Sequence, residues 1–160
     1  MTENKGVLLM FYKASYGTLW DKLIAKLDGS PYSHVEIVLR WEQVSDLSHY
    51  LGTTTTISTI GCRADTGQVT TSLYSEFQSL DFILLPEASE EIYAHLDRNY
   101  SFLKLLRTKF NWWKLFPKHT DVCSTWVARV LGLIEPDKWG VKDLYRYAET
   151  RGIKVIPLKR

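Results

Sequence analysis

Long apolar runs and cysteines are both scarce in this chain of 160 residues. No apolar stretch approaches the roughly 20 residues that a membrane-spanning helix needs, so the sequence predicts no transmembrane segment. Residues 1–5 lack a basic start followed by an apolar stretch, and no secretory signal is expected. The chain has only 2 cysteines, Cys62 and Cys123, with dissimilar neighbours. A disulfide scaffold is therefore excluded, and a reducing, cytoplasmic compartment is the default interpretation.

The chain also lacks an excess of charge of one sign. Its 20 Lys and Arg residues against 18 Asp and Glu give a net charge of +2, which offers no strong electrostatic case for nucleic acid or an acidic membrane surface. The 45% hydrophobic and 24% charged residues are typical of a globular protein and exclude disorder. No repeat or linker is visible, so the length predicts a single domain over residues 1–160.

Hydrophobic patterns predict a mixture of strands and helices. Strands are expected at 6–12, 33–40, 52–61, 67–72, 81–85 and 153–157. Helices are expected at about 17–28, from about 88 to 98 or beyond, from an N-cap at Thr120 or Asp121 to Gly132, and from 136 to about 149. This order predicts an α+β domain, with an antiparallel sheet covered by helices on one face.

Three side chains form the sharpest candidate site: His34, Glu36 and Cys123. Cys123 lies in the first turn of a predicted helix, where unpaired amides and the helix dipole favour a reactive thiolate. The apolar spacing of that helix turns the thiol toward the sheet. His34 and Glu36 stand two residues apart on a predicted strand and therefore share one face. A carboxylate there would orient the imidazole of a Cys–His pair.

A structural interpretation of the same residues remains open at this point. A lone cysteine on an apolar helix face is usually a small buried hydrophobic residue, and a histidine at a strand start is often only structural. Glu36 fits that interpretation poorly, because a carboxylate between Val35 and Ile37 either faces water or must be paired.

The other polar features of the sequence are weaker evidence for a functional site. His49, His95 and His119 have no metal-ligand spacing with the cysteines, so neither a metal nor another cofactor is expected. Cys62 is expected to be a surface or semi-buried thiol. The basic and aromatic segment 104–118, within a longer excursion predicted over 99–119, would form a lid or a patch for an anionic polymer or membrane. The commoner outcome is that a basic helix packs its aromatic side chains into the core.

Two segments of the chain, 33–38 (Ser-His-Val-Glu-Ile-Val) and 123–133 (Cys-Ser-x-x-Val-x-x-x-Leu-Gly-Leu), resemble signature segments of the circularly permuted NlpC/P60 papain-like cysteine hydrolases. Permutation puts the strand histidine before the helix cysteine, as here. The resemblance extends to a small, phage-encoded branch, through echoes at 58–59, 65–69 and 100–106. It covers residues 6–157, although Thr66 and Gln68 depart from a glycine-rich turn.

The resemblance implies a permuted papain-like fold in which Cys123 is the nucleophile, His34 the general base and Glu36 the orienting acid. Many relatives take the third polar group from the following strand, which here offers Thr54, Thr56 and Ser58 but no acid, so Glu36 is preferred. The Cys123 amide is the expected oxyanion donor, with Tyr32 or Tyr12 as side-chain alternatives.

The expected activity is that of a cysteine peptidase or amidase acting on an amide, with peptidoglycan as the family-level substrate. A thioesterase or acyltransferase would need the same pair of residues. A non-catalytic phage virion or host-interaction protein is the alternative from another class. A phage-encoded protein would reside in the host cytoplasm or with the virion.

Overall fold

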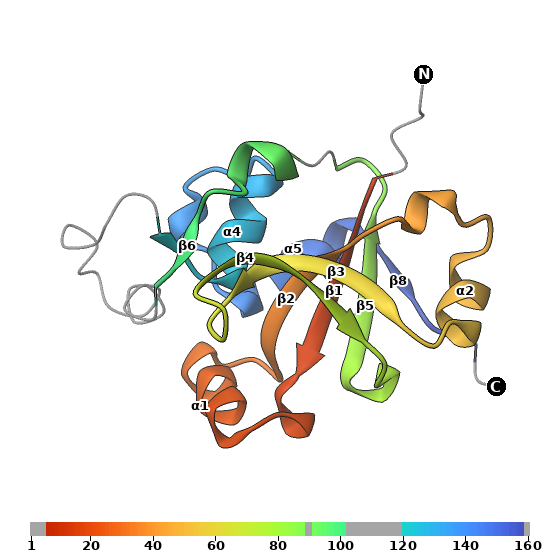
Figure 1. Ribbon diagram of the computed structural model, residues 1–160, viewed down its shortest axis with the longest axis horizontal. Coiled ribbons are helices and arrows are strands. Elements are labelled where there is room, and N and C mark those ends of the chain that lie inside the picture. The colour runs from red at the N-terminus through yellow and green to blue at the C-terminus, as the bar shows by residue number, and fades with distance from the viewer. Residues whose placement is uncertain (1–5, 89–90, 102–119, 159–160) are drawn as a thin grey trace.

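Eight strands in the described part of this computed structural model form one sheet, in the order β7-β6-β4-β3-β2-β1-β5-β8 (Figure 1). The structure describes residues 6–88, 91–101 and 120–158. Neighbouring strands are antiparallel except for the parallel pair β6–β7. The strands are β1 (Val7–Lys13), β2 (Tyr32–Val38), β3 (Ile57–Arg63), β4 (Gln68–Tyr74), β5 (Leu80–Leu85), β6 (Asn99–Tyr100), β7 (Thr120–Asp121) and β8 (Ile153–Val155).

Helices lie at several places around this sheet. The α-helices of the described residues are α1 (Leu19–Asp28), α2 (Leu47–Thr53), α4 (Cys123–Val130) and α5 (Val141–Arg151). Short 3₁₀ turns occupy Ala14–Tyr16, Trp41–Gln43, Phe77–Ser79, Ile92–His95 and Pro136–Lys138. The protein is therefore of the mixed α+β class that the sequence predicts.

The central strand β1 is buried on both faces. Residues 7–11 form an unbroken apolar run and are all 0% exposed. Val7, Leu9 and Phe11 pack in a first core cluster with residues of α4 and α5. Leu8 and Met10 point the other way, into a second core cluster. An apolar run without alternation is what a strand covered on both sides requires.

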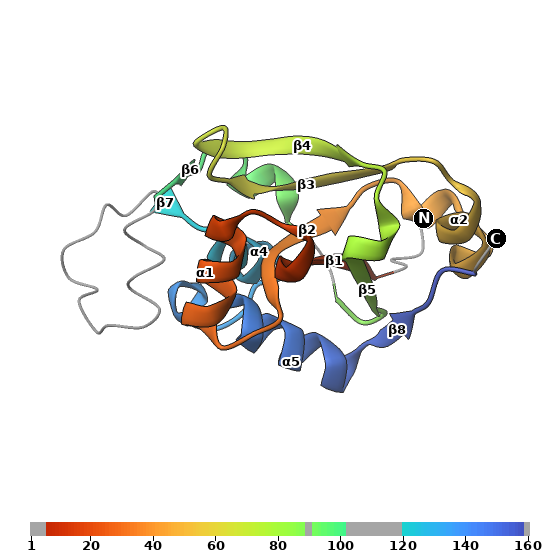
Figure 2. The same ribbon diagram turned by 90° about the horizontal axis from the view of Figure 1, so that it is seen from below.

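The second core cluster corrects the prediction that helices cover one face only. Trp41 and Leu51, from the 3₁₀ turn and α2, pack with Val38 and Phe82 on the face opposite α4 and α5. Figure 2 shows α2 at one end of the sheet and α4 and α5 beneath its middle. The predicted strand at 52–61 begins later than expected, because residues 52–53 close α2 and β3 starts at Ile57.

The prediction of a helix from about 88 to 98 or beyond is wrong. Residues 92–95 form a single 3₁₀ turn, and the chain then becomes strand β6. Tertiary contacts explain the difference: the Trp126 indole donates to the His95 carbonyl at 2.8 Å, and the Tyr100 amide donates to the Gly67 carbonyl at 2.8 Å. These bonds draw the backbone to the sheet edge. The segment predicted as a lid or basic patch, 104–118, lies outside the described residues.

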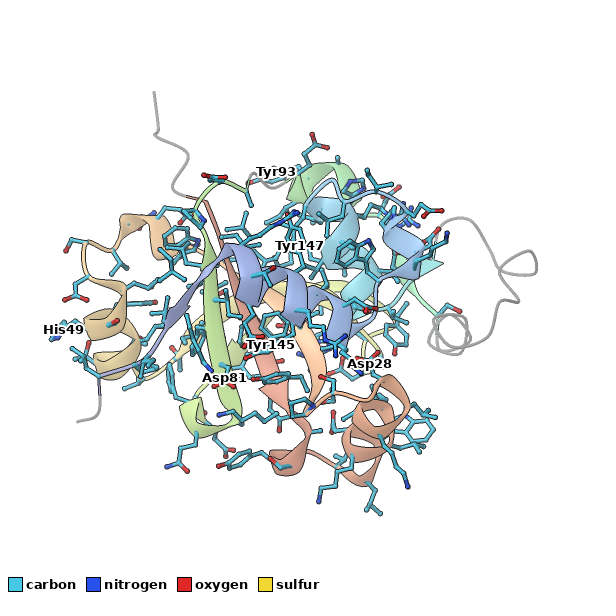
Figure 3. The ribbon with its side chains drawn as sticks, turned by 180° about the vertical axis from the view of Figure 1, so that it is seen from behind. Asp28, His49, Asp81, Tyr93, Tyr145 and Tyr147 are labelled. Atoms are coloured by element: carbon cyan, nitrogen blue, oxygen red, sulfur yellow. The ribbon has the colours of Figure 1, made fainter. Side chains whose placement is uncertain are left out.

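The C-terminal helix also starts later than predicted. Pro136 begins only a 3₁₀ turn, and α5 starts at Val141 after a break at Trp139 and Gly140. Asp28, at the end of α1, accepts the Lys142 amide at 2.6 Å and so caps α5. Figure 3 shows Asp28 where these two helices meet.

Candidate active site

Strand β2 carries two of the three candidate residues, and the structure brings them into contact. His34 Nε2 lies 2.7 Å from Glu36 Oε1. Val35 and Ile37 point into the first core cluster, so the alternation of the strand places His34 and Glu36 together on its other face. The His34 side chain is 18% exposed, whereas the Glu36 side chain is 0% exposed. The imidazole therefore links solvent to a fully buried carboxylate.

Strand β3 supplies the other partners of that carboxylate. The Thr59 hydroxyl donates to Glu36 Oε2, and Arg63 Nη1 donates to Glu36 Oε1 at 3.0 Å. Burial by itself would raise the pKa of Glu36, but the attraction of His34 and the bonds from His34, Thr59 and Arg63 outweigh it and lower that pKa. Glu36 is thus held as an anion inside the protein, in agreement with the expectation that a carboxylate at this position must be paired.

Gly61 leaves the space that the Glu36 side chain fills. A Cβ at Gly61 would lie 2.6 Å from Glu36 Cγ. Residues 59, 61 and 63 alternate onto one face of β3, and the Ile37–Ile60 pair brings this face beside Glu36. Thr59 and Arg63 therefore bind the Glu36 carboxylate, and Gly61 leaves room for it because it has no side chain.

The sequence did not reveal these partners of Glu36. Thr54, Thr56 and Ser58 were considered as alternatives to Glu36 for the third polar group, whereas the residues of β3 that bind Glu36 are Thr59 and Arg63. A period-two pattern of Thr59, Gly61 and Arg63 was visible in the sequence. It was uninformative without the register that places β3 against β2.

Arg63 is itself held by several acceptors. Its Nη1 also donates to Ser72 Oγ at 3.0 Å and Tyr74 Oη at 2.9 Å. Nε and Nη2 bind the Asp65 carboxylate, each at 2.9 Å. This planar, two-pronged pairing fixes the guanidinium more firmly than a lysine at the same place would be fixed.

Cys123 is the third candidate residue. It is the first residue of α4, a helix that packs on β2 and β3, and it is 5% exposed. Burial alone would lower the pKa of His34. Attraction to Cys123 and Glu36, and hydrogen bonds to both side chains, raise it to about 10. The imidazole is therefore bound to the Glu36 carboxylate, interacts with the Cys123 thiol, and is favoured as its cation.

A buried polar cluster fixes the backbone at the N-terminus of α4. Asp121 is 0% exposed and accepts from the Arg98 guanidinium and, at 2.9 Å, from Thr125 Oγ1. Thr125 Oγ1 in turn accepts the Val122 amide at 2.9 Å. The N-cap is thus Val122 and not Thr120 or Asp121. Asp121 instead anchors the backbone immediately before Cys123.

The remaining candidates lie away from the thiol or have other partners. The Tyr32 hydroxyl donates to Asp81 at 2.5 Å, and the Tyr12 hydroxyl donates to the Tyr16 carbonyl at 3.2 Å, so neither tyrosine is available as an oxyanion donor. Figure 3 shows Asp81 beside Tyr145 on the face opposite that of Figure 1. Cys62 is 0% exposed, which corrects the expectation of a surface or semi-buried thiol.

Comparisons with protein-family models, with curated proteins and with solved structures find no match. The resemblance to permuted papain-like hydrolases therefore stays a prediction. Within the described residues, no group of three or more His, Cys, Asp or Glu side chains is arranged to hold a metal ion. In the same part of the chain, no helix is both long enough and apolar enough to cross a membrane.

Proposed function

We propose that this protein is a cysteine hydrolase of the permuted papain-like type that cleaves an amide by acyl transfer. The observation that carries the proposal is a single imidazole, that of His34, which is bound to the buried Glu36 carboxylate at 2.7 Å and interacts with the Cys123 thiol at the start of α4. A nucleophile, a base and a group that orients the base are the three parts of such a mechanism.

In the proposed reaction His34 transfers the protons and Cys123 forms the covalent bond to the substrate. Because His34 Nε2 is bound to Glu36, Nδ1 is the ring nitrogen left for the thiol. His34 takes the thiol proton, and Cys123 Sγ attacks the carbonyl carbon of the amide. His34 then gives the proton to the amide nitrogen, the C–N bond breaks, and the amine leaves. Water, deprotonated by His34, attacks the thioester and releases the acid and the thiol.

Electrostatics favour the first of these steps. The pKa of His34 is raised to about 10, so near neutral pH the imidazole holds the proton that it takes from the thiol. Glu36, with its lowered pKa, supplies the balancing negative charge. The Cys123 amide lies in the first turn of α4, where helix amides lack a partner within the helix, and it is the donor that we assign to the tetrahedral oxyanion.

Thiol reactivity tests this proposal, and Cys62 is a built-in control. Both thiols are buried, at 0% for Cys62 and 5% for Cys123, so exposure alone predicts slow labelling of both. A hydrolase predicts preferential alkylation of Cys123 by iodoacetamide near neutral pH, located by peptide mass spectrometry. The rate should fall about 10- to 100-fold in His34→Ala, by the loss of thiolate expected without an imidazolium partner. Equal, slow labelling of both cysteines contradicts the proposal.

The substrate needs a separate experiment. We propose peptidoglycan peptides as the first substrates to try, on the resemblance alone. Purified cell-wall fragments would be incubated with the wild-type protein and with Cys123→Ala, and the products analysed by mass spectrometry. Fragments cleaved only by the wild type support the peptidoglycan assignment. Intact fragments alongside a reactive Cys123 would redirect the search to other acyl substrates, such as thioesters.

A further inference from the structure

Helix α1 turns its apolar side chains outward. Leu19 is 85% exposed, Trp20 50%, Leu23 42% and Leu27 43%. Of the 12 exposed large hydrophobic side chains in the described ranges, 4 therefore lie on this one helix of 10 residues. Single exposed apolar residues are ordinary, but a contiguous group marks an interaction surface.

The helix is fixed in this orientation from its inner side. Ala25 and Asp28 are its buried residues. Asp21 caps the N-terminus with Thr18 and accepts Ser33 Oγ from β2 at 3.1 Å. With about 100° of rotation per residue, Asp21, Ala25 and Asp28 lie on one side. The three leucines, four residues apart, run along the opposite side.

Charge on the outer side has one sign. Both acidic residues of α1 are engaged inward, by Ser33 and by the amide of Lys142. Lys22 and Lys26 are exposed and border the leucine row. Neither forms an ion pair with a residue of the described part of the chain. The chain as a whole has a net charge of only +2, so this arrangement is a local one that overall charge did not reveal.

We infer that the outer side of α1 docks on an anionic phospholipid surface. Leucines beside lysines are the arrangement of a helix that lies in the membrane interface, where lysine stems lie along the apolar layer and their ammonium groups meet the lipid phosphates. A stable protein interface uses about 20–30 residues a side, which a helix of 10 residues does not supply. The inference does not depend on the proposed hydrolase activity.

Sedimentation with lipid vesicles tests the inference. The wild-type protein should sediment with vesicles of phosphatidylcholine containing about 30% phosphatidylserine, with weaker binding as salt is added. Leu19→Gln/Leu23→Gln should weaken binding about tenfold or more, because both side chains would enter the apolar layer. Lys22→Gln/Lys26→Gln should weaken it about 30-fold on these vesicles and little on pure phosphatidylcholine.

A matched control changes equally exposed apolar residues elsewhere. Tyr93 and Ile134 are 91% and 86% exposed, and Figure 3 shows Tyr93 at the end of the molecule away from α1. Tyr93→Gln/Ile134→Gln should bind vesicles as the wild type does. All variants should show the wild-type thermal unfolding by circular dichroism, because the changed side chains are exposed.

Three results would overturn the inference. The first is a wild-type protein that stays in solution with these vesicles. The second is equal loss of binding in the α1 variants and the control. The third is self-association in analytical ultracentrifugation that disappears in Leu19→Gln/Leu23→Gln while no vesicle binding occurs, which would assign the surface to a second copy. The vesicle and ultracentrifugation measurements are repeated on Cys123→Ala, which lacks the proposed nucleophile. Its vesicle binding should equal that of the wild type, so the inference on α1 and the proposed hydrolase activity can fail separately.

Discussion

Substitution of Gly61 by alanine tests the buried carboxylate with one added methyl group. The new Cβ would lie 2.6 Å from Glu36 Cγ, 3.2 Å from Cδ and 3.3 Å from Oε1. Carbon atoms in contact normally lie about 3.5–4.0 Å apart, so Glu36 would have to move by about 1 Å. Gly61 is not among the glycines with positive φ, and the backbone itself accepts alanine.

Glu36 cannot make that movement without losing its partners. It lies 2.7 Å from His34 Nε2 and 3.0 Å from Arg63 Nη1. A shift of about 1 Å takes either contact beyond hydrogen-bond range. Overpacking costs about 1–3 kcal/mol, and loss of one charged hydrogen bond about 1.5–3 kcal/mol. We expect the free energy of unfolding of Gly61→Ala to fall by about 2–4 kcal/mol, with slower alkylation of Cys123.

Urea unfolding followed by tryptophan fluorescence measures the first effect, and a double-mutant cycle assigns it. In a Glu36→Ala background the clash is gone, so Gly61→Ala should cost about 0.5 kcal/mol or less. If alanine is equally destabilising in both backgrounds, the contact with Glu36 is not the cause. Wild-type stability together with a wild-type alkylation rate would refute the reasoning altogether.

Two further predictions concern Arg63 and pH. Arg63→Met should lower the free energy of unfolding by about 2–4 kcal/mol in urea titrations, because it leaves the Glu36 carboxylate buried with fewer partners. The control is Arg146→Met, at an exposed position of α5, which should change the free energy of unfolding by about 0.5 kcal/mol or less. The pKa of His34 is raised from 6.5 to about 10, so its contribution to stability is complete below pH 6.5 and lost as pH rises toward 10. The pKa of Glu36 is lowered from 4.5, so its contribution is complete above pH 4.5 and lost in acid. Unfolding measured across pH should show a decline above pH 6.5 that His34→Ala lacks, and a decline with the same slope in both proteins would contradict the assignment.

Local sequence patterns predicted those elements whose structure depends mainly on local interactions. Strands β1, β2 and β5 follow apolar or β-branched runs, and α1 (Leu19–Asp28) lies within the predicted range of about 17–28. The exposure of the leucines of α1 was not foreseen, since helical periodicity identifies an apolar face without showing what covers it.

The failures occur where distant contacts decide the backbone. Residues 92–100 have helical spacing, yet bonds from Trp126 and to Gly67 draw them into a turn and a strand. Helix α2 was missed, because its short mixture of apolar and polar residues with a glycine favours no single element. It forms under an Asp46 cap and packs Leu51 into the second core cluster.

The pairing of His34 with Glu36 was determined by the sequence alone, because alternation along one strand puts residues two apart on the same face. The meeting of that pair with Cys123 was decided only in three dimensions. It depends on α4, some 90 residues later in the chain, packing on β2 and β3, and on Asp121 anchoring the backbone just before the thiol. The roles of Thr59, Gly61 and Arg63 likewise depend on strand register, which is a relation between segments and is carried by neither segment alone.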